Sequence, residues 1–107
     1  MTKSIHPSDI KTIILACEAG IGSSLMSVNS LKKKLKAAKV TGVNVIHKAT
    51  ATIPKNANFI ICHNGIKGSV RASAPDAVIV GFQMFFNDPV FDKIVKAFVE
   101  GTEIVEN

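Results

Sequence analysis

The sequence predicts a single α/β domain with a four-stranded parallel sheet, in the strand order 2-1-3-4 counted along the chain, and helices on both faces. Three observations support this fold class. Four short apolar runs alternate with segments that show helical spacing or contain glycine and proline. The first apolar run does not alternate with polar residues, as expected for a strand buried on both faces. The chain has 107 residues, 47% of them apolar, which suits one domain with an ordinary core.

Local patterns place the first elements in chain order. Residues 1–9 are polar and predict an extended or frayed lead. A helix is expected from about residue 22 to about residue 39, because apolar residues recur every three or four positions, at Val28, Leu31, Leu35 and Ala38. The four apolar runs predict strands at residues 11–16, 43–47, 58–63 and 77–80.

Three connections between the predicted elements have distinct compositions. Residues 48–56 are of mixed polarity and predict a connection with one helical turn. Residues 64–75 predict a short helix that its glycines weaken. Residues 82–86, after a strand ended by Gly81, predict an apolar connection that leads to the last helix.

The last helix has clear start and stop signals. Asp88 is expected to be its N-cap, with Pro89 at the first helical position, where the missing N–H of proline costs nothing. Gly101 is expected to end the helix. Residues 102–107 then predict an acidic tail.

A loop rich in glycine and serine joins the first predicted strand to the first predicted helix. It reads Cys17, Glu18, Ala19, Gly20, Ile21, Gly22, Ser23 and Ser24. Such a loop turns backbone N–H groups toward one point, and the helix N-terminus adds partial positive charge there. Ligands of doubly wound sheets bind at this place, beyond the carboxyl end of a central strand. The loop therefore predicts that Cys17 is a nucleophile that accepts a phosphoryl group, with residues 18–24 forming the cradle around it.

The loop residues also have structural alternatives. Cys17 is, in the plainest alternative, a small buried apolar residue. Ser23 and Ser24 are suitable helix caps, a role compatible with phosphate binding. Glu18 would oppose ionisation of a nearby thiol, so its carboxylate is expected to point away, toward the surface of a partner.

Two further residues with reactive side chains end a later strand. Cys62 is expected to fill the strand interior, and His63 reaches the same edge of the sheet as Cys17. His63 is either a structural residue or an auxiliary group that donates to a phosphoryl oxygen or tunes Cys17. Cys62 and His63 are adjacent, and no second pair stands at a zinc-like interval, so no metal site is predicted. The proposed chemistry requires no cofactor.

The charge of the chain is uneven. The net charge is +5, with eleven basic and two acidic residues in 1–71 and two basic and six acidic residues in 72–107. The basic part contains the glycine loop, which suits phosphorylated or anionic partners. A single arginine and the lack of tyrosine and tryptophan disfavour nucleic acid. The lysines of the first helix form either a solvated face or a docking surface for an acidic partner.

The sequence predicts a cytoplasmic domain that does not insert into a membrane. No apolar run approaches the ~20 residues needed to cross a bilayer. The first nine residues lack the apolar core of a signal peptide. Two cysteines are too few for a disulfide framework, so both are expected to be reduced.

The loop and the strand pattern resemble the cytoplasmic phosphocysteine IIB domains of sugar phosphotransferase systems (PTS) of the lactose, cellobiose and mannitol type, above all the mannitol class. That class carries a Cys-acidic-Ala-Gly-hydrophobic-Gly-Ser-Ser-x-Met loop, and residues 17–26 match it throughout. The basic stretch 31–35 and the strand 60–63, which ends in a histidine, are also similar. The resemblance covers nearly the whole chain. It implies that residues 1–107 form a single IIB domain with a Rossmann-like sheet and a phosphatase-like phosphate loop.

The resemblance implies a phosphoryl relay. A phosphohistidine on a IIA protein would give its phosphoryl group to Cys17, and the phosphocysteine would give it to a sugar held by a membrane IIC protein. Mannitol or a related hexitol is the expected sugar. Two departures from the family are expected: mannitol-class domains are often fused to IIC whereas this domain is expected to stand alone, and the side chains after His63 differ, beginning with Asn64 and Gly65.

Three other classes of protein also use a loop of this kind. A small cysteine phosphatase has an arginine near the end of its Cys-x5-Arg loop, but Ser23 occupies that position and the one arginine is Arg71. A regulatory IIB-like domain of a transcription regulator is the non-catalytic alternative. A P-loop nucleotide enzyme is excluded, because no Gly-Lys-Ser/Thr follows the glycines.

Overall fold

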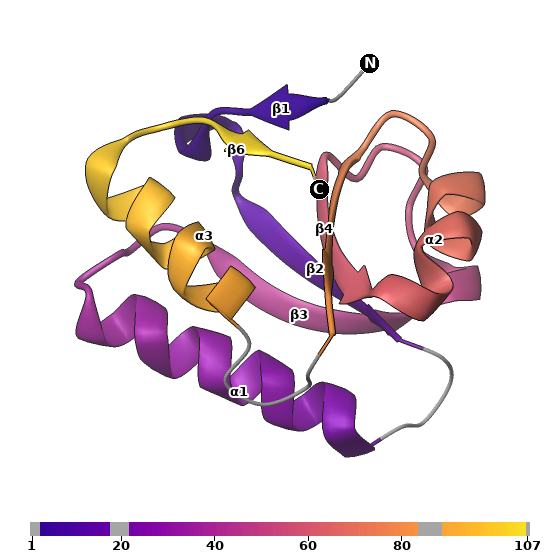
Figure 1. The fold of residues 1–107 in the computed structure, drawn as a ribbon, viewed down its shortest axis with the longest axis horizontal. Helices are drawn as coiled ribbons and strands as arrows, with labels where there is room; N and C mark the ends of the chain where they lie inside the picture. The colour runs from indigo at the N-terminus through magenta and orange to yellow at the C-terminus, as the bar shows by residue number, and fades with distance from the viewer. Residues whose placement is uncertain (1–2, 18–21, 84–88, 107) are drawn as a thin grey trace.

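A central parallel sheet of four strands organises the molecule (Figure 1). The computed structural model describes residues 3–17, 22–83 and 89–106, with only the backbone described for 17 and 22–27. The strands lie in the order β3-β2-β4-β5 and all pair in parallel. Their bounds are Thr12–Cys17 (β2), Asn44–Ala49 (β3), Phe59–His63 (β4) and Val78–Phe82 (β5). The predicted order 2-1-3-4 is therefore confirmed.

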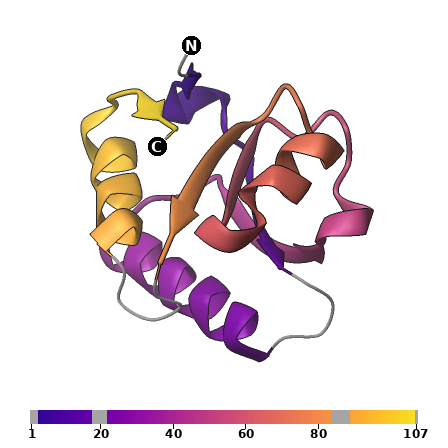
Figure 2. The ribbon, with the colours of Figure 1, turned by 45° about the vertical axis from the view of Figure 1, so that its right-hand side comes forward.

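Helices cover both faces of this sheet, as predicted (Figure 2). The helices α1 (Gly22–Ala37) and α3 (Pro89–Glu100) pack on one face, and the short α2 (Lys67–Ser73) packs on the other. Alternate residues of β2 point to opposite faces of the sheet. Ile13 and Leu15 belong to the core between the sheet and α1 and α3, and Ile14 belongs to the core between the sheet and α2. Burial of both faces explains the continuous apolar run of this strand.

The predicted connections contain the expected helical turns, but two of their bounds differ, because β3 continues to Ala49 and β5 continues to Phe82. A 3₁₀ turn at Thr50–Thr52 (η2) supplies the helical turn expected within residues 48–56. A second turn, Asn64–Ile66 (η3), leads into α2 within the predicted segment 64–75. Gly81 does not end its strand, because β5 continues to Phe82. Asp88 and most of the connection 82–86 lie outside the described residues.

The start and end of α3 agree with the predicted start and stop residues, whereas α1 ends earlier than predicted. Pro89 is the first residue of α3, and Gly101 follows its end with φ 71°. Helix α1 ends at Ala37, two residues earlier than predicted, and the backbone N–H of Val40 donates to the Leu35 carbonyl at 2.9 Å. Lys39 makes this turn in the left-handed region, with φ 61°, where glycine is usual.

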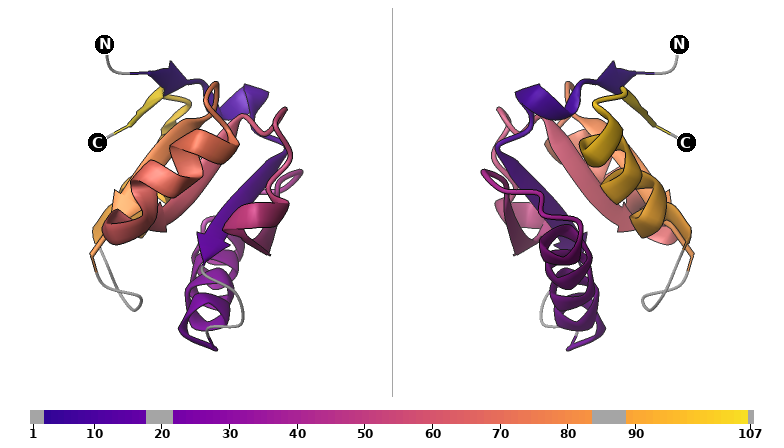
Figure 3. Two further views of the ribbon diagram at one scale, coloured as in Figure 1. Left: turned by 90° about the vertical axis from the view of Figure 1, so that its right-hand side faces the viewer. Right: turned by 90° about the vertical axis from the view of Figure 1, so that its left-hand side faces the viewer.

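The two ends of the chain pair with each other, which the sequence analysis did not predict. Strand β1 (Ser4–Ile5) runs antiparallel to β6 (Ile104–Val105), and a 3₁₀ turn at Pro7–Asp9 (η1) connects β1 to the main sheet. The two strands lie side by side in the views of Figure 3. Of the two predicted alternatives for residues 1–9, extended or frayed, the structure shows the extended one at Ser4–Ile5, and the predicted acidic tail 102–107 contains a paired strand instead of a free end. The reason is that Ile5 and Ile104 pack against the main core.

Candidate active site

Cys17 is the last residue of the central strand β2, at the carboxyl edge of the sheet. Its backbone is level with Ala49 of β3, and the preceding Ala16 is level with Cys62 of β4. The chain leaves β2 toward β3 and later crosses to β4 on the other side, so Cys17 stands at the point where the strand order reverses. Such a point is where doubly wound sheets bind ligands.

Helix α1 begins at Gly22, after a connection of four residues from Cys17. It is 16 residues long and has no acidic residue in its first turn, so its N-terminal N–H groups present partial positive charge. Gly22, Ser23 and Ser24 belong to this first turn, as predicted. The predicted loop residues Glu18, Ala19, Gly20 and Ile21 lie outside the described residues, and the side chains of Ser23 and Ser24 are not described.

His63 ends β4 at the same edge and is half-buried. Its Nδ1 accepts from the backbone N–H of Gly65 at 3.0 Å, and its Nε2 lies 3.2 Å from the carbonyl oxygen of Gln83. A carbonyl only accepts, so this arrangement assigns the ring proton to Nε2. The ring also meets Phe82 edge-on, with centroids 5.8 Å apart. These contacts connect the ends of β4 and β5, while a role of His63 toward a phosphoryl group stays a prediction.

Gly81, Asn64 and Lys67, which the sequence analysis did not assign to the site, complete this edge of the sheet. A Cβ on Gly81 would lie 1.9 Å from Oδ1 of Asn64 and 2.8 Å from Cδ of Lys67. Glycine at position 81 therefore makes room for both side chains over the end of β5. The structure places Gly81 inside a buried apolar strand, where a glycine often marks close approach of another group, whereas the sequence analysis took it as the end of that strand.

Cys62 is fully buried, as predicted for a residue that fills the strand interior. Burial raises the pKa of the Cys62 thiol to about 11, although the positive charge of Lys67 acts in the opposite direction. Cys62 is therefore a neutral thiol at physiological pH and contributes packing to the α2 core.

Arg71 lies at the amino edge of β5, away from Cys17. Its Nη1 donates to the carbonyl oxygens of Pro75 at 3.1 Å and Ala77 at 2.8 Å, and its Nη2 pairs with the Glu106 carboxylate at 2.5 Å. The chain has no other arginine. An arginine clamp of the cysteine-phosphatase type is therefore not available at the carboxyl edge.

Neither a metal centre nor a membrane span is found in the described part of the chain. Among residues 3–17, 22–83 and 89–106, no group of three or more His, Cys, Asp and Glu side chains is placed to hold a metal ion. None of the helices described there is long and apolar enough to cross a membrane.

Comparison with known proteins decides the family. Residues 12–97 match the family described as "PTS system, Lactose/Cellobiose specific IIB subunit". The chain belongs to the PTS IIB family. The matched residues span the main sheet and all three helices except the end of α3, so the family assignment includes the edge that carries Cys17.

Individual relatives of this IIB domain are mannitol-specific components. The chain is 38% identical over 93 residues, 87% of its length, to the PTS system mannitol-specific EIICBA component of Buchnera aphidicola. It is 30% identical over 92 residues, 86% of its length, to the PTS system mannitol-specific EIICB component of Bacillus subtilis. The chain spans only 15% and 19% of these two relatives. The resemblance to the mannitol class is confirmed.

Proposed function

We propose that this IIB domain is a phosphoryl carrier and that Cys17 is the residue that carries the phosphoryl group. In the first step the sulfur of Cys17 attacks the phosphorus of a phosphohistidine on a IIA protein, so that an S–P bond forms as the N–P bond breaks. In the second step a sugar hydroxyl attacks the same phosphorus. The S–P bond breaks, the thiolate leaves, and the hydroxyl proton passes to a base or to water.

The place of Cys17 in the fold is the observation that carries this proposal. Cys17 ends the central strand at the reversal of strand order, and α1 begins after four further residues with a first turn free of carboxylates. The helix N-terminus favours both a thiolate and a phosphoryl dianion. Phosphoryl transfer needs mainly positioning and charge stabilisation, which the backbone N–H groups of the loop and of Gly22, Ser23 and Ser24 would supply.

The hydrogen bonds of Arg71, which hold it away from Cys17, favour a phosphoryl carrier over a hydrolase. In a phosphatase an arginine fork would stabilise the transition state for attack by water. Here the guanidinium donates to Pro75, Ala77 and Glu106 at the other edge of the sheet. A phosphocysteine without that fork has less assistance for hydrolysis, as a relay requires.

The names of the relatives support a proposal for the sugar and the partners. Both relatives are named as mannitol-specific components that join EIIB to EIIC in one protein. We infer that this domain serves mannitol or a related hexitol, that a phosphorylated IIA protein supplies the phosphoryl group, and that a membrane IIC protein holds the sugar. The domain would then work in the cytoplasm, next to its IIC partner. A regulatory IIB-like module stays an alternative without an observation in its favour.

Phosphorylation of a matched pair of variants tests the proposal. Cys17→Ser should abolish labelling by a radiolabelled phospho-IIA protein and abolish sugar phosphorylation with IIC. Cys62→Ala is the control, because it removes a buried, un-ionised thiol and should leave labelling intact. The label should be acid-stable, unlike a phosphohistidine. Acid-labile labelling, or full labelling of Cys17→Ser, would show that another residue carries the phosphoryl group.

A further inference from the structure

We propose that a groove between α1 and β3 binds an acidic, extended segment of a partner protein, which pairs with the open edge of β3. The groove has a volume of about 610 Å³. It includes Thr12 and Asn44, which are level with each other at the start of β2 and β3, whereas Cys17 and Ala49 are level at the far ends. Five residues of strand separate the two levels, roughly 16 Å. The groove therefore lies at the opposite end of β3 from the phosphoryl-transfer edge.

One wall of the groove is formed by β3 at Val45, and the open backbone edge of this strand continues beyond the groove to His47. Strand β3 pairs with β2 on one side only in the described sheet. The N–H of Asn44 donates to Lys11 at 2.9 Å, so alternation directs the main-chain groups of Val45 and His47 outward. Within residues 3–17, 22–83 and 89–106, no hydrogen bond satisfies these outward groups of Val45 and His47. An extended peptide could add here as a further strand.

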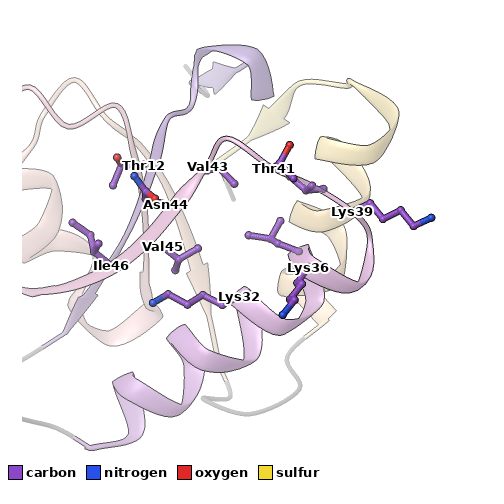
Figure 4. A pocket seen from close by; sticks show the side chains of 11 residues that line it. Thr12, Lys32, Lys36, Lys39, Thr41, Val43, Asn44, Val45 and Ile46 are labelled. Atoms are coloured by element: carbon purple, nitrogen blue, oxygen red, sulfur yellow. The ribbon is translucent and has the colours of Figure 1, made fainter.

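The other wall carries positive charge. Lys32, Lys36 and Lys39 lie along one side of α1 and its C-terminal turn, all exposed. Figure 4 shows that their side chains leave the backbone in different directions and do not converge on one point. In the part of the chain that the structure describes, these three lysines make no ion pair, whereas Lys34 pairs with Asp92 at 2.9 Å. This spread of charge suits carboxylates distributed along an extended chain better than one small anion.

The conformation of Lys39 is a second, independent observation. This residue has φ 61°, in the region where a side chain is unfavourable and glycine is usual. A lysine therefore occupies the end of α1 at a cost to stability. A requirement for positive charge at the end of the groove explains this choice of residue.

The floor of the groove and the composition of the chain identify a protein segment as the occupant. Val43 and Val45 line the groove beside Ile46, which is 37% exposed for a large apolar residue. An acidic segment with alternating apolar residues matches both walls. The groove contains no arginine or aromatic residue for nucleic acid. A lipid surface is a less suitable occupant, because it would not form hydrogen bonds with the backbone groups at the edge of β3. The chain's own acidic end is also excluded, because Glu106 is already paired with Arg71.

Binding of a synthetic peptide to the whole chain tests the proposal. The probe is a fluorescent eight-residue peptide of alternating glutamate and valine, measured by anisotropy at low salt and again in about 0.5 M salt. Each of Lys32→Gln, Lys36→Gln and Lys39→Gln should weaken binding about threefold, and the triple variant about thirtyfold. The matched control removes the same charge from exposed positions outside the groove, by Lys33→Gln, Lys93→Gln and Lys96→Gln together. This control should bind the peptide almost normally.

Additional variants and a second peptide distinguish binding in the groove from non-specific attraction between opposite charges and from phosphoryl transfer. Lys39→Gly should raise the melting temperature while weakening peptide binding. A peptide with proline at alternate positions should bind at least tenfold more weakly, because it cannot donate to the strand edge. Cys17→Ser should bind the peptide normally, and the triple glutamine variant should still accept a phosphoryl group.

Three results would overturn the inference. The first is equal loss of binding in the control and groove triple variants. The second is unchanged binding of the proline peptide. The third is tighter binding of an oligonucleotide or of vesicles of anionic phospholipid than of the acidic peptide. Because Cys17→Ser is scored separately in both assays, failure here is distinguishable from failure of the phosphoryl-carrier proposal.

Discussion

The carboxylate of Glu106 fastens the end of the chain to the outer strand of the sheet. It accepts from the backbone N–H of Ile79 at 3.1 Å and pairs with Arg71 Nη2 at 2.5 Å, and its side chain is only 14% exposed. The N–H of Ile79 belongs to the edge strand β5, so this contact also closes part of the open edge. We predict that Glu106→Gln destabilises the domain.

The size of the effect follows from these contacts. Glutamine keeps one acceptor oxygen but loses the charge, so one charge-assisted hydrogen bond weakens and Arg71, 37% exposed, loses its counter-ion. We expect a loss of about 1–2 kcal/mol, which is a fall of roughly 4–10 °C in melting temperature for a domain of this size. Glu106→Ala should cost more, about 2–3 kcal/mol, because the Ile79 N–H then also lacks its acceptor.

The effect should also depend on pH. Burial raises the pKa of Glu106, but the hydrogen bonds from Ile79 and Arg71 and the Arg71 charge outweigh it and hold the pKa below its ordinary value of 4.5. A carboxyl with a lowered folded-state pKa stabilises the fold above its unfolded pKa, and this contribution is lost as pH falls through the folded value. The difference between wild type and Glu106→Gln should therefore be constant near neutral pH and shrink below about pH 4.

Chemical denaturation at several pH values measures this difference. The control is Glu100→Gln, which removes a carboxylate from an exposed position at the end of α3. Equal midpoints for wild type and Glu106→Gln, or the same change in both glutamine variants, would refute the assignment of stability to this contact. A difference that grows as the pH falls would contradict the sign of the linkage.

Two further predictions concern the carboxyl edge. Gly81→Ala should cost about 1–3 kcal/mol of stability, because the new Cβ would lie 1.9 Å from Oδ1 of Asn64. Adding Asn64→Ala should restore most of it, and an equal loss in the double variant would contradict this cause. Iodoacetamide at about pH 7.5 should modify Cys17 but not Cys62 in the folded protein, because a pKa of about 11 leaves about 0.03% of the Cys62 thiol ionised. Equal rates of modification would contradict the burial of Cys62.

Local patterns in the sequence predicted most of the fold and the position of the candidate site. Apolar runs and helical spacing depend on neighbours along the chain, so the four strands, the order 2-1-3-4 and the starts of α1 and α3 could be predicted. The loop after the first strand carries the nucleophile, the glycines and the helix start within eight consecutive residues. For that reason the local pattern is enough to place Cys17 at the end of the central strand.

Contacts between distant parts of the chain could not be predicted in this way. The pairing of β1 with β6, the engagement of Arg71 and the fit of Asn64 over Gly81 each join segments that no periodicity connects. A polar end with short apolar stretches looks like a frayed tail until another strand is present to pair with it. Likewise, a lysine on α1 looks solvated until β3 forms the opposite wall of a groove.

The class of fold, the family resemblance and the position of the cysteine could all be inferred from the order of the residues, because they depend on short-range spacing and on one continuous motif. The folded arrangement was needed to learn where the ends of the chain lie, what Arg71 and Glu106 do, and which lysines face an open strand edge. Burial and charge pairing depend on which surfaces come together, and those surfaces meet only when the whole sheet and its helices assemble.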